Sequence, residues 1–218
     1  MNRVSVAIGI RVVLAIAMVL AVGALVRDGV RAGDFVPVDF FGYFTIQSNL
    51  IGAAVLVAAA RWTGADRPAW LEWARLSATT YLVIVGIVYW GLLFPQSGPP
   101  ANPLADYTLH GLACVTIVID WVLEGPRSTL RLRSMWIPLV YPAVWIAVTV
   151  VRGATDGWVP YFFLDPARGY GPVAVTTGTI LLAGLALGVL LSRLTRWRAV
   201  SPSRNAAPVA PASTSVNP

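Results

Sequence analysis

The chain has 218 residues, of which 57% are hydrophobic and only 12% are charged, with a mean hydropathy of +0.70. A soluble domain of this size usually carries about a quarter charged residues, so the composition argues against a soluble enzyme or binding domain. The 16 basic residues, all arginine, give a formal charge of +6. They gather at the ends of apolar runs, a pattern that indicates membrane orientation rather than nucleic-acid binding.

Six apolar runs are each long enough to cross a bilayer. They cover about 4–26, 40–60, 74–94, 105–124, 134–152 and 172–192. Because the connections are short, the sequence predicts an all-α polytopic bundle of six transmembrane helices within residues 1–198. Residues 199–218 are rich in Pro, Ala and Ser and predict a disordered cytoplasmic tail.

The arginines also predict which way the bundle crosses the membrane. With the first residue in the cytoplasm, the outer side holds only Arg27, Arg31, Arg152 and Arg168, whereas the inner side holds eleven arginines. The positive-inside rule therefore places both termini in the cytoplasm. The absence of lysine, with abundant Ala, Arg and Val, indicates a bacterial plasma membrane. A cleaved signal peptide is the alternative for the first run, but that run is long and contains Arg11.

The second run begins with FFGYFTIQSNL and is unusually polar for a spanning helix. Residues three and four apart share a helix face, so Thr45, Ser48 and Asn49 form one stripe that ends on Gly52. Gln47 points elsewhere. One interpretation is that these groups hydrogen-bond neighbouring helices and hold the bundle together. The other is that they belong to a functional site.

His110, the only histidine, lies near the start of the fourth run. Thr45 and His110 each follow the predicted start of their helix by five residues, which puts both about 7–8 Å inside the same face of the bundle. A titratable side chain at membrane depth is a functional candidate. The alternative is that His110 is only a structural hydrogen-bonding group.

A threonine hydroxyl becomes a useful nucleophile when a base removes its proton, and neutral imidazole suits that task. Asp106 precedes His110 by four residues and could orient its ring. Ser48 or Asn49, one turn from Thr45, could donate to a developing oxyanion. These residues predict acyl transfer from an ester to Thr45, followed by hydrolysis, at a site facing the outer leaflet.

Two further charges lie inside predicted spans. Arg11 and Asp120 fall at similar depth near the inner ends of the first and fourth runs, so we expect a structural ion pair; a proton or ion path is the alternative. One histidine and one cysteine make a metal cluster or haem site unexpected, and we predict no metal and no cofactor.

The segment at 156–172 mixes aromatic residues with three prolines, a composition that favours the membrane interface. We expect it to cross the outer helix ends, with Tyr161 and Asp165 as candidates for the mouth of the site; a cap beside Pro166 is the alternative for Asp165. In the last run, Gly184 and Gly188 form a small-residue pair that seats a neighbouring helix, either within the chain or in a homo-oligomer.

Three segments, YFTIQSNL, LHGLACVTIVIDW and GWVPYFFLDP, together resemble the androgen-induced protein family, which includes the androgen-dependent TFPI-regulating protein. The resemblance covers about residues 5–192 and implies a multi-span intramembrane hydrolase that cleaves fatty acid esters of hydroxy fatty acids. It also implies that Thr45 and His110 are the catalytic pair. The chain departs from the animal members in the polar IQSN and in its outer loop before the fourth run, which leaves a related lipid ester open as the substrate.

Two functions therefore compete. The first is a membrane lipid-ester hydrolase whose partner is a lipid substrate. The second is a non-enzymatic bundle, either a transporter of small molecules or ions or a lipid-binding scaffold. A cavity that holds Thr45 and His110 and is closed below Gly52 would favour the enzyme. A continuous polar route to Asp120 would favour transport.

Overall fold

The computed structural model describes residues 2–126 and 130–194, so the tail predicted at 199–218 lies outside the described residues. The described chain is 82% helical and contains no β-strand. Six helical stretches in it are long and apolar enough to cross a membrane. The all-α membrane bundle predicted from the sequence is thereby confirmed.

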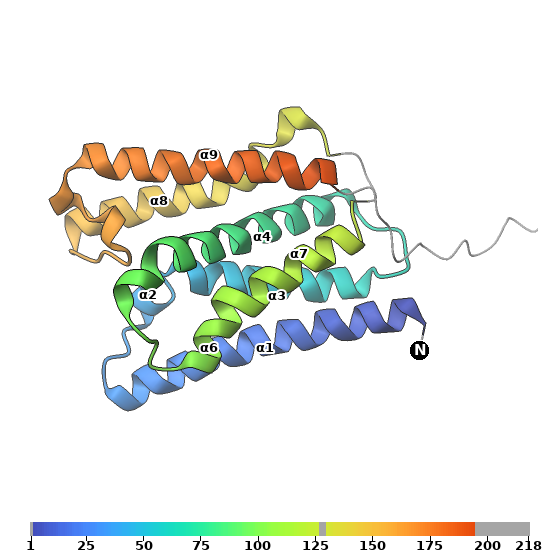
Figure 1. Ribbon diagram of the computed structural model, residues 1–218, viewed down its shortest axis with the longest axis horizontal. Helices are drawn as coiled ribbons and strands as arrows, with labels where there is room; N and C mark the ends of the chain where they lie inside the picture. The colour runs from blue at the N-terminus through green and yellow to red at the C-terminus, as the bar shows by residue number, and fades with distance from the viewer. Residues whose placement is uncertain (1, 127–129, 195–218) are drawn as a thin grey trace, which may run out of the picture.

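Figure 1 shows the six stretches lying side by side along the long axis of the molecule. They are α1 (Arg3–Ala32), α3 (Phe44–Arg61), α4 with η1 and α5 (Ala69–Val88, Tyr89–Leu93 and Phe94–Ser97), α6 with η2 and α7 (Pro103–Tyr107, Thr108–Leu112 and Ala113–Leu123), η3 with α8 (Leu132–Ser134 and Ile137–Thr155), and α9 (Tyr170–Leu194). Three short helices complete the described chain: α2 (Pro37–Phe40), η4 (Phe162–Leu164) and η5 (Pro166–Arg168).

The helix boundaries depart from the predicted ones where local chemistry decides them. The first helix extends beyond residue 26 and ends at Ala32, because Gly33 adopts a left-handed φ of 78° and its N–H caps the last carbonyls. The second spanning helix begins at Phe44 rather than at residue 40. A turn at Gly42 separates it from α2, and a Cβ there would lie 2.5 Å from the Trp158 ring, so the turn depends on glycine.

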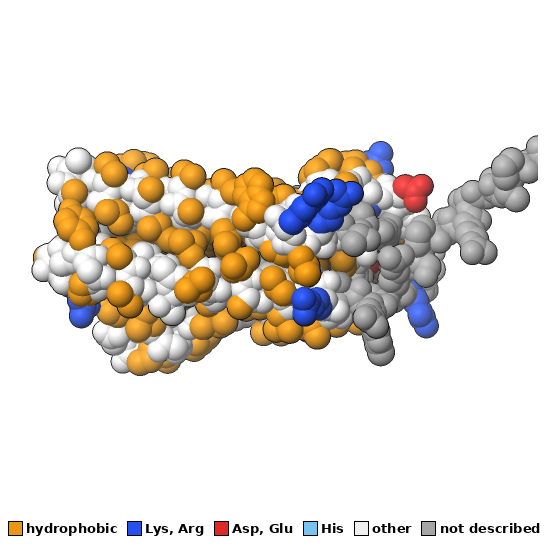
Figure 2. All heavy atoms as spheres, turned by 90° about the horizontal axis from the view of Figure 1, so that it is seen from above, with side chains coloured by type: hydrophobic (Ala, Val, Ile, Leu, Met, Phe, Trp, Pro, Cys, Tyr) orange, Lys and Arg blue, Asp and Glu red, His pale blue; other side chains and the backbone are white. Residues whose placement is uncertain are grey.

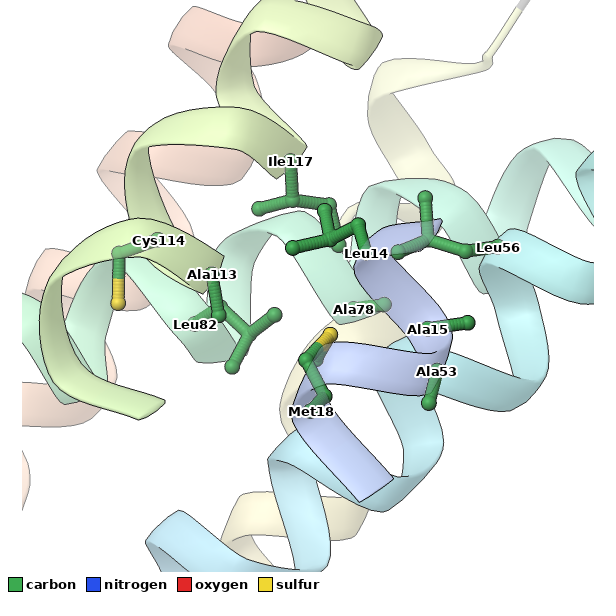
Figure 3. Packing of buried hydrophobic residues seen from close by; sticks show 10 residues of the cluster. All are labelled: Leu14, Ala15, Met18, Ala53, Leu56, Ala78, Leu82, Ala113, Cys114 and Ile117. Carbon is green, nitrogen blue, oxygen red and sulfur yellow. The ribbon is translucent and has the colours of Figure 1, made fainter. Parts of the chain in front are cut away.

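Helix α4 lies at the centre of the bundle and contacts α3, α7, α8 and α9, while α1 packs against α3 (Figure 1). A cluster of buried apolar side chains from α1, α3, α4 and α7 fills the middle of this group, as Figure 3 shows. Met18 and Leu82 lie within it and are fully buried. The tight packing of this layer fixes the position of α3 relative to its neighbours.

The exterior is suited to lipid. Figure 2 shows hydrophobic side chains along much of the visible face of the molecule, with arginines near its two ends, more of them toward one end than the other. Large apolar residues such as Val13, Leu20 and Leu182 are about two-thirds exposed. An apolar belt of this extent is what a bilayer covers.

Candidate functional site

Thr45 occupies the first turn of α3, at the end of the bundle where α4 finishes and α6 begins. Its side chain is 9% exposed, and its hydroxyl lies 3.4 Å from the hydroxyl of Tyr161. The backbone N–H of Thr45, which has no partner within the helix, donates to the same tyrosine oxygen at 3.4 Å. Both contacts are long for hydrogen bonds of their kind. The Thr45 hydroxyl is therefore held loosely and can take another partner.

Ser48 and Asn49 share the face of Thr45, as their spacing predicts, but their donors are already used. The Ser48 hydroxyl donates to the Phe44 carbonyl at 2.6 Å. The Asn49 amide donates to the carbonyls of Thr45 and Leu109, at 2.9 and 3.3 Å. Both residues are fully buried, so these bonds tie α3 to itself and to η2. This geometry supports a structural role for them rather than oxyanion stabilisation.

Thr45 and Tyr161 line a cavity of about 70 Å³ between α4, α8 and α9. Its walls are apolar over most of their length and include Ile84, Val88, Trp145, Ile180 and Leu181. Thr80 and Gly184 lie at the opposite end from Thr45. None of the described residues that line it is charged. The apolar walls suit a hydrocarbon ligand.

His110 lies in η2, directly after Leu109, and is held from two sides. Its Nδ1 lies 3.0 Å from the backbone oxygen of Asp106 and 3.3 Å from the Asp106 carboxylate. Since both neighbours are acceptors, Nδ1 is the donor in these contacts, which in a neutral imidazole makes Nε2 the acceptor. The ring stacks on Tyr89 with centroids 3.7 Å apart, and the Tyr89 hydroxyl donates to the same Asp106 carboxylate.

Two π-helical segments create this arrangement. Tyr89 opens η1 and His110 sits in η2, and the Trp90 indole donates to the His110 carbonyl at 3.0 Å. A π-helical turn inserts one extra residue and rotates the side chains that follow, and such turns are frequent at functional sites. Here the two turns face one another. They place the ring of Tyr89 against the imidazole of His110, so that the two stack.

Thr45 and His110 lie at the same end of the bundle but make no hydrogen bond with one another in the described chain. Tyr89 stands between the two parts of the site, because it lines the cavity with Thr45 and stacks on His110. His110 itself is not among the residues that line the cavity. The structure thus provides an oriented imidazole beside a cavity that contains an accessible hydroxyl.

The segment after α8 covers the start of α3. Arg152 donates to Asp39 at 2.8 Å and lies over the Trp158 ring at 4.2 Å. The Trp145 indole donates to the Gly42 carbonyl at 2.8 Å. These contacts hold the segment across this end of the bundle, as its aromatic composition predicts, and deliver the Tyr161 hydroxyl to Thr45.

Asp165 does not face Thr45. Its carboxylate accepts from the Ala167 N–H at 2.9 Å and caps η5, which is the capping alternative considered for it. Tyr161, expected only at the mouth, is instead the direct partner of Thr45. Burial raises the pKa of Tyr161, so its hydroxyl stays protonated and able to donate.

The opposite end of the bundle contains a second polar group, the buried ion-pair cluster. Its members are Arg11, Arg67, Glu72, Arg75, Asp120 and Glu124. Arg11 donates to Asp120 at 2.6 Å, as expected, and also to Glu124 and to Thr63. Arg75 donates to Asp120 at 2.8 Å. Three cations alternate with three anions, which offsets the cost of burying each charge.

The apolar cluster of Figure 3 lies between the two polar groups. At Gly52, where the stripe of α3 ends, an added Cβ would lie 2.9 Å from Leu82 and 3.0 Å from Met18. Neither Gly52 nor any residue of the ion-pair cluster lines the cavity of Thr45, which extends along α4 to Thr80. Within the described residues, packed apolar side chains separate the Thr45 hydroxyl from Asp120.

Gly184 and Gly188 pack within the chain. A Cβ at Gly184 would lie 3.3 Å from Leu139 of α8, and one at Gly188 would lie 4.0 Å from the Thr80 hydroxyl of α4. This agrees with the intrachain alternative for the glycine pair. In the part of the chain that the structure describes, no cluster of three or more His, Cys, Asp or Glu side chains could hold a metal ion.

Sequence reasoning did not single out Tyr89, and it placed Tyr161 at the mouth of the site rather than against Thr45. Tyr89 completes the unit of Asp106 and His110, and Tyr161 contacts Thr45 directly. The aromatic density of the two segments that contain them was the available signal. Comparison with family models, with curated proteins and with solved structures finds no significant match to this chain.

Proposed function

We propose that the protein is an intramembrane lipid-ester hydrolase in which Thr45 is the nucleophile and His110 is the general base. The observation that carries the proposal is the uncharged cavity, which presents a hydroxyl at one end to any lipid chain bound along it. The resemblance of the three sequence segments to the androgen-induced protein family supports the same pair of residues. A bacterial plasma membrane, with the site near its outer leaflet, is part of the proposal.

In the reaction, the Thr45 oxygen attacks the ester carbonyl carbon while its proton passes to Nε2 of His110. The Tyr161 hydroxyl, next to the Thr45 oxygen, donates to the carbonyl oxygen as that atom becomes negative. When the carbon–oxygen bond breaks, His110 returns the proton to the departing alcohol. Water, activated by His110 in the same way, then releases the fatty acid from Thr45.

His110 is prepared for this role by its neighbours. Asp106 keeps the proton on Nδ1 and stabilises the imidazolium that forms in the reaction. The Thr45 hydroxyl and His110 have to approach each other, directly or through a water molecule, when substrate fills the cavity. Hydrogen bonds that serve catalysis are often long without substrate and shorten in the complex.

Transport is less well supported. A conducting path would have to connect the cavity with Asp120, but packed side chains of the apolar cluster lie between them. Opening this layer would expose fully buried residues such as Leu82 and Met18. The charges of the buried ion-pair cluster are instead paired with one another.

The test is hydrolysis of long-chain fatty acid esters by the purified protein in detergent or nanodiscs. We expect Thr45→Ala to abolish turnover, and Thr179→Ala, which alters an exposed threonine of α9, to leave it unchanged. A fluorophosphonate probe should label the wild type and spare Thr45→Ala, with the modified peptide identified by mass spectrometry. Full activity in a correctly folded Thr45→Ala protein would refute the assignment.

A further inference from the structure

We propose that the cavity holds a single acyl chain and that Gly184 sets the length of chain the site accepts. The inference builds on the proposed function, because the acyl chain would belong to the ester that Thr45 attacks. It makes one residue of α9, far from the reacting groups, responsible for the choice of substrate.

The dimensions of the cavity suit a long chain. Along α4 and η1 the lining residues run from Thr80 to Leu93. At 1.5 Å per residue this is a length of about 20 Å. A linear hydrocarbon chain can extend along such a path.

The chemistry of the walls decides what can occupy the cavity. Because no charged side chain lines it, a phosphate or ammonium group would lose its hydration without gaining a partner. The hydroxyls of Thr45 and Tyr161 lie together at one end and offer hydrogen bonds there. An ester carbonyl would therefore bind at this end, with its apolar chain directed towards Gly184.

Gly184 forms the far end because it has no side chain. It is buried, and a Cβ added there would lie 3.3 Å from Leu139 and 4.0 Å from the methyl group of Thr80. All three residues line the cavity. A larger side chain at this position would point into the space between α4 and α8, so it would shorten the cavity from its closed end.

The experiment measures hydrolysis of p-nitrophenyl butyrate, octanoate, laurate and palmitate by the full-length protein in nanodiscs. For Gly184→Leu we expect the ratio of palmitate to butyrate hydrolysis to fall at least about tenfold, since pocket volume discriminates substrates by one or two orders of magnitude. Gly178→Leu is the matched control, on the same helix but outside the cavity and with open space around its Cβ. It should leave the ratio unchanged.

Two variants guard against misfolding of Gly184→Leu. Gly184→Ala should shift the ratio in the same direction by less, and Leu139→Ala, which enlarges the far end, should raise it. A folded Gly184→Leu protein with the wild-type ratio would overturn the inference, as would an equal shift in Gly178→Leu.

Binding separates this inference from the proposed function. Native mass spectrometry of the Thr45→Ala protein should detect bound palmitate, and the added change Gly184→Leu should remove it while Gly178→Leu should not. Gly184-dependent binding by a protein whose wild type hydrolyses no ester would support the acyl-chain cavity and refute the hydrolase. No palmitate binding would overturn the cavity proposal itself.

Discussion

The two polar ends of the bundle are built on opposite principles. At one end, the members of the buried ion-pair cluster bond to each other through short contacts, such as the 2.6 Å between Arg11 and Asp120. At the other end, the hydroxyls of Thr45 and Tyr161 are 3.4 Å apart and face a cavity. Arg11, Asp120 and Glu124 also line a hollow, of about 330 Å³, but their charged groups are engaged in short ion pairs. The hydroxyls of Thr45 and Tyr161 have only long contacts and stay available.

The difference separates stability from function inside one membrane domain. Removing a charge from the ion-pair cluster leaves its partners buried and unpaired, so we expect folding to suffer. Removing a hydroxyl or an imidazole from the Thr45 end breaks weak contacts, so we expect the fold to remain and the chemistry to stop. The predictions below test this division.

The largest effect is expected at His110. Substitution by Gln keeps a polar side chain of similar reach but removes the base, and general acid–base catalysis typically contributes 10²–10⁴-fold. We therefore expect ester hydrolysis by His110→Gln to fall by about 10³-fold, which corresponds to about 4 kcal/mol. The thermal unfolding temperature should change little. Loss of folding together with activity would show that His110 serves the bundle instead.

The next effect is expected in the ion-pair cluster. Asp120→Asn removes the charge that Arg11 and Arg75 share and should destabilise the protein by about 3 kcal/mol. For a chain of this size the unfolding temperature would fall by roughly 6–12 °C. Differential scanning fluorimetry in detergent measures the shift.

The control for this experiment is Asp66→Asn, the same change at an exposed position, which should be neutral to within about 0.5 kcal/mol. Equal stability of Asp120→Asn and Asp66→Asn would break the comparison between the two ends. That result would favour the alternative in which Asp120 belongs to an ion path.

A third effect is expected at Tyr161. Tyr161→Phe keeps the ring that stacks on Phe163 but removes the hydroxyl beside Thr45. Loss of one oxyanion donor typically costs 10²–10³-fold, and we expect about 10²-fold in kcat with little change in KM. Tyr170→Phe, at an exposed tyrosine of the same region, is the control. If Tyr161→Phe keeps the wild-type kcat, the Tyr161 hydroxyl does not donate to the carbonyl oxygen in the reaction.

These residues also show which features of the structure can be predicted from the sequence. Hydropathy predicted all six spans, because a bilayer imposes length and composition on each helix separately. Helical spacing predicted that Thr45, Ser48 and Asn49 share a face, since that too is a local property. The pairing of Arg11 with Asp120 needed only similar depth and opposite charge.

What escaped prediction depends on contacts between distant segments. Tyr161 is 116 residues from Thr45, and its position depends on how the segment after α8 folds over the start of α3. The stack of Tyr89 on His110 requires two π-helical turns. In a regular α-helix the side chains of Tyr89 and His110 would point in other directions. No sequence pattern predicts the extra residue of a π-helical turn.

The smallest effect concerns Thr80, at the far end of the cavity. Its hydroxyl is buried and has no hydrogen-bond partner in the described chain, whereas the equally buried Thr149 donates to the Trp145 carbonyl at 2.8 Å. Replacing an unsatisfied hydroxyl by a methyl removes a desolvation penalty, but replacing a satisfied one loses a bond. Thr80→Val should therefore stabilise the protein by up to about 1 kcal/mol, and Thr149→Val should destabilise it by about as much. Scanning fluorimetry of the two variants side by side measures the difference in sign. If Thr80→Val is the more destabilising of the two, the hydroxyl has a partner within the fold, and the cavity end of the bundle is as fully bonded as the ion-pair cluster.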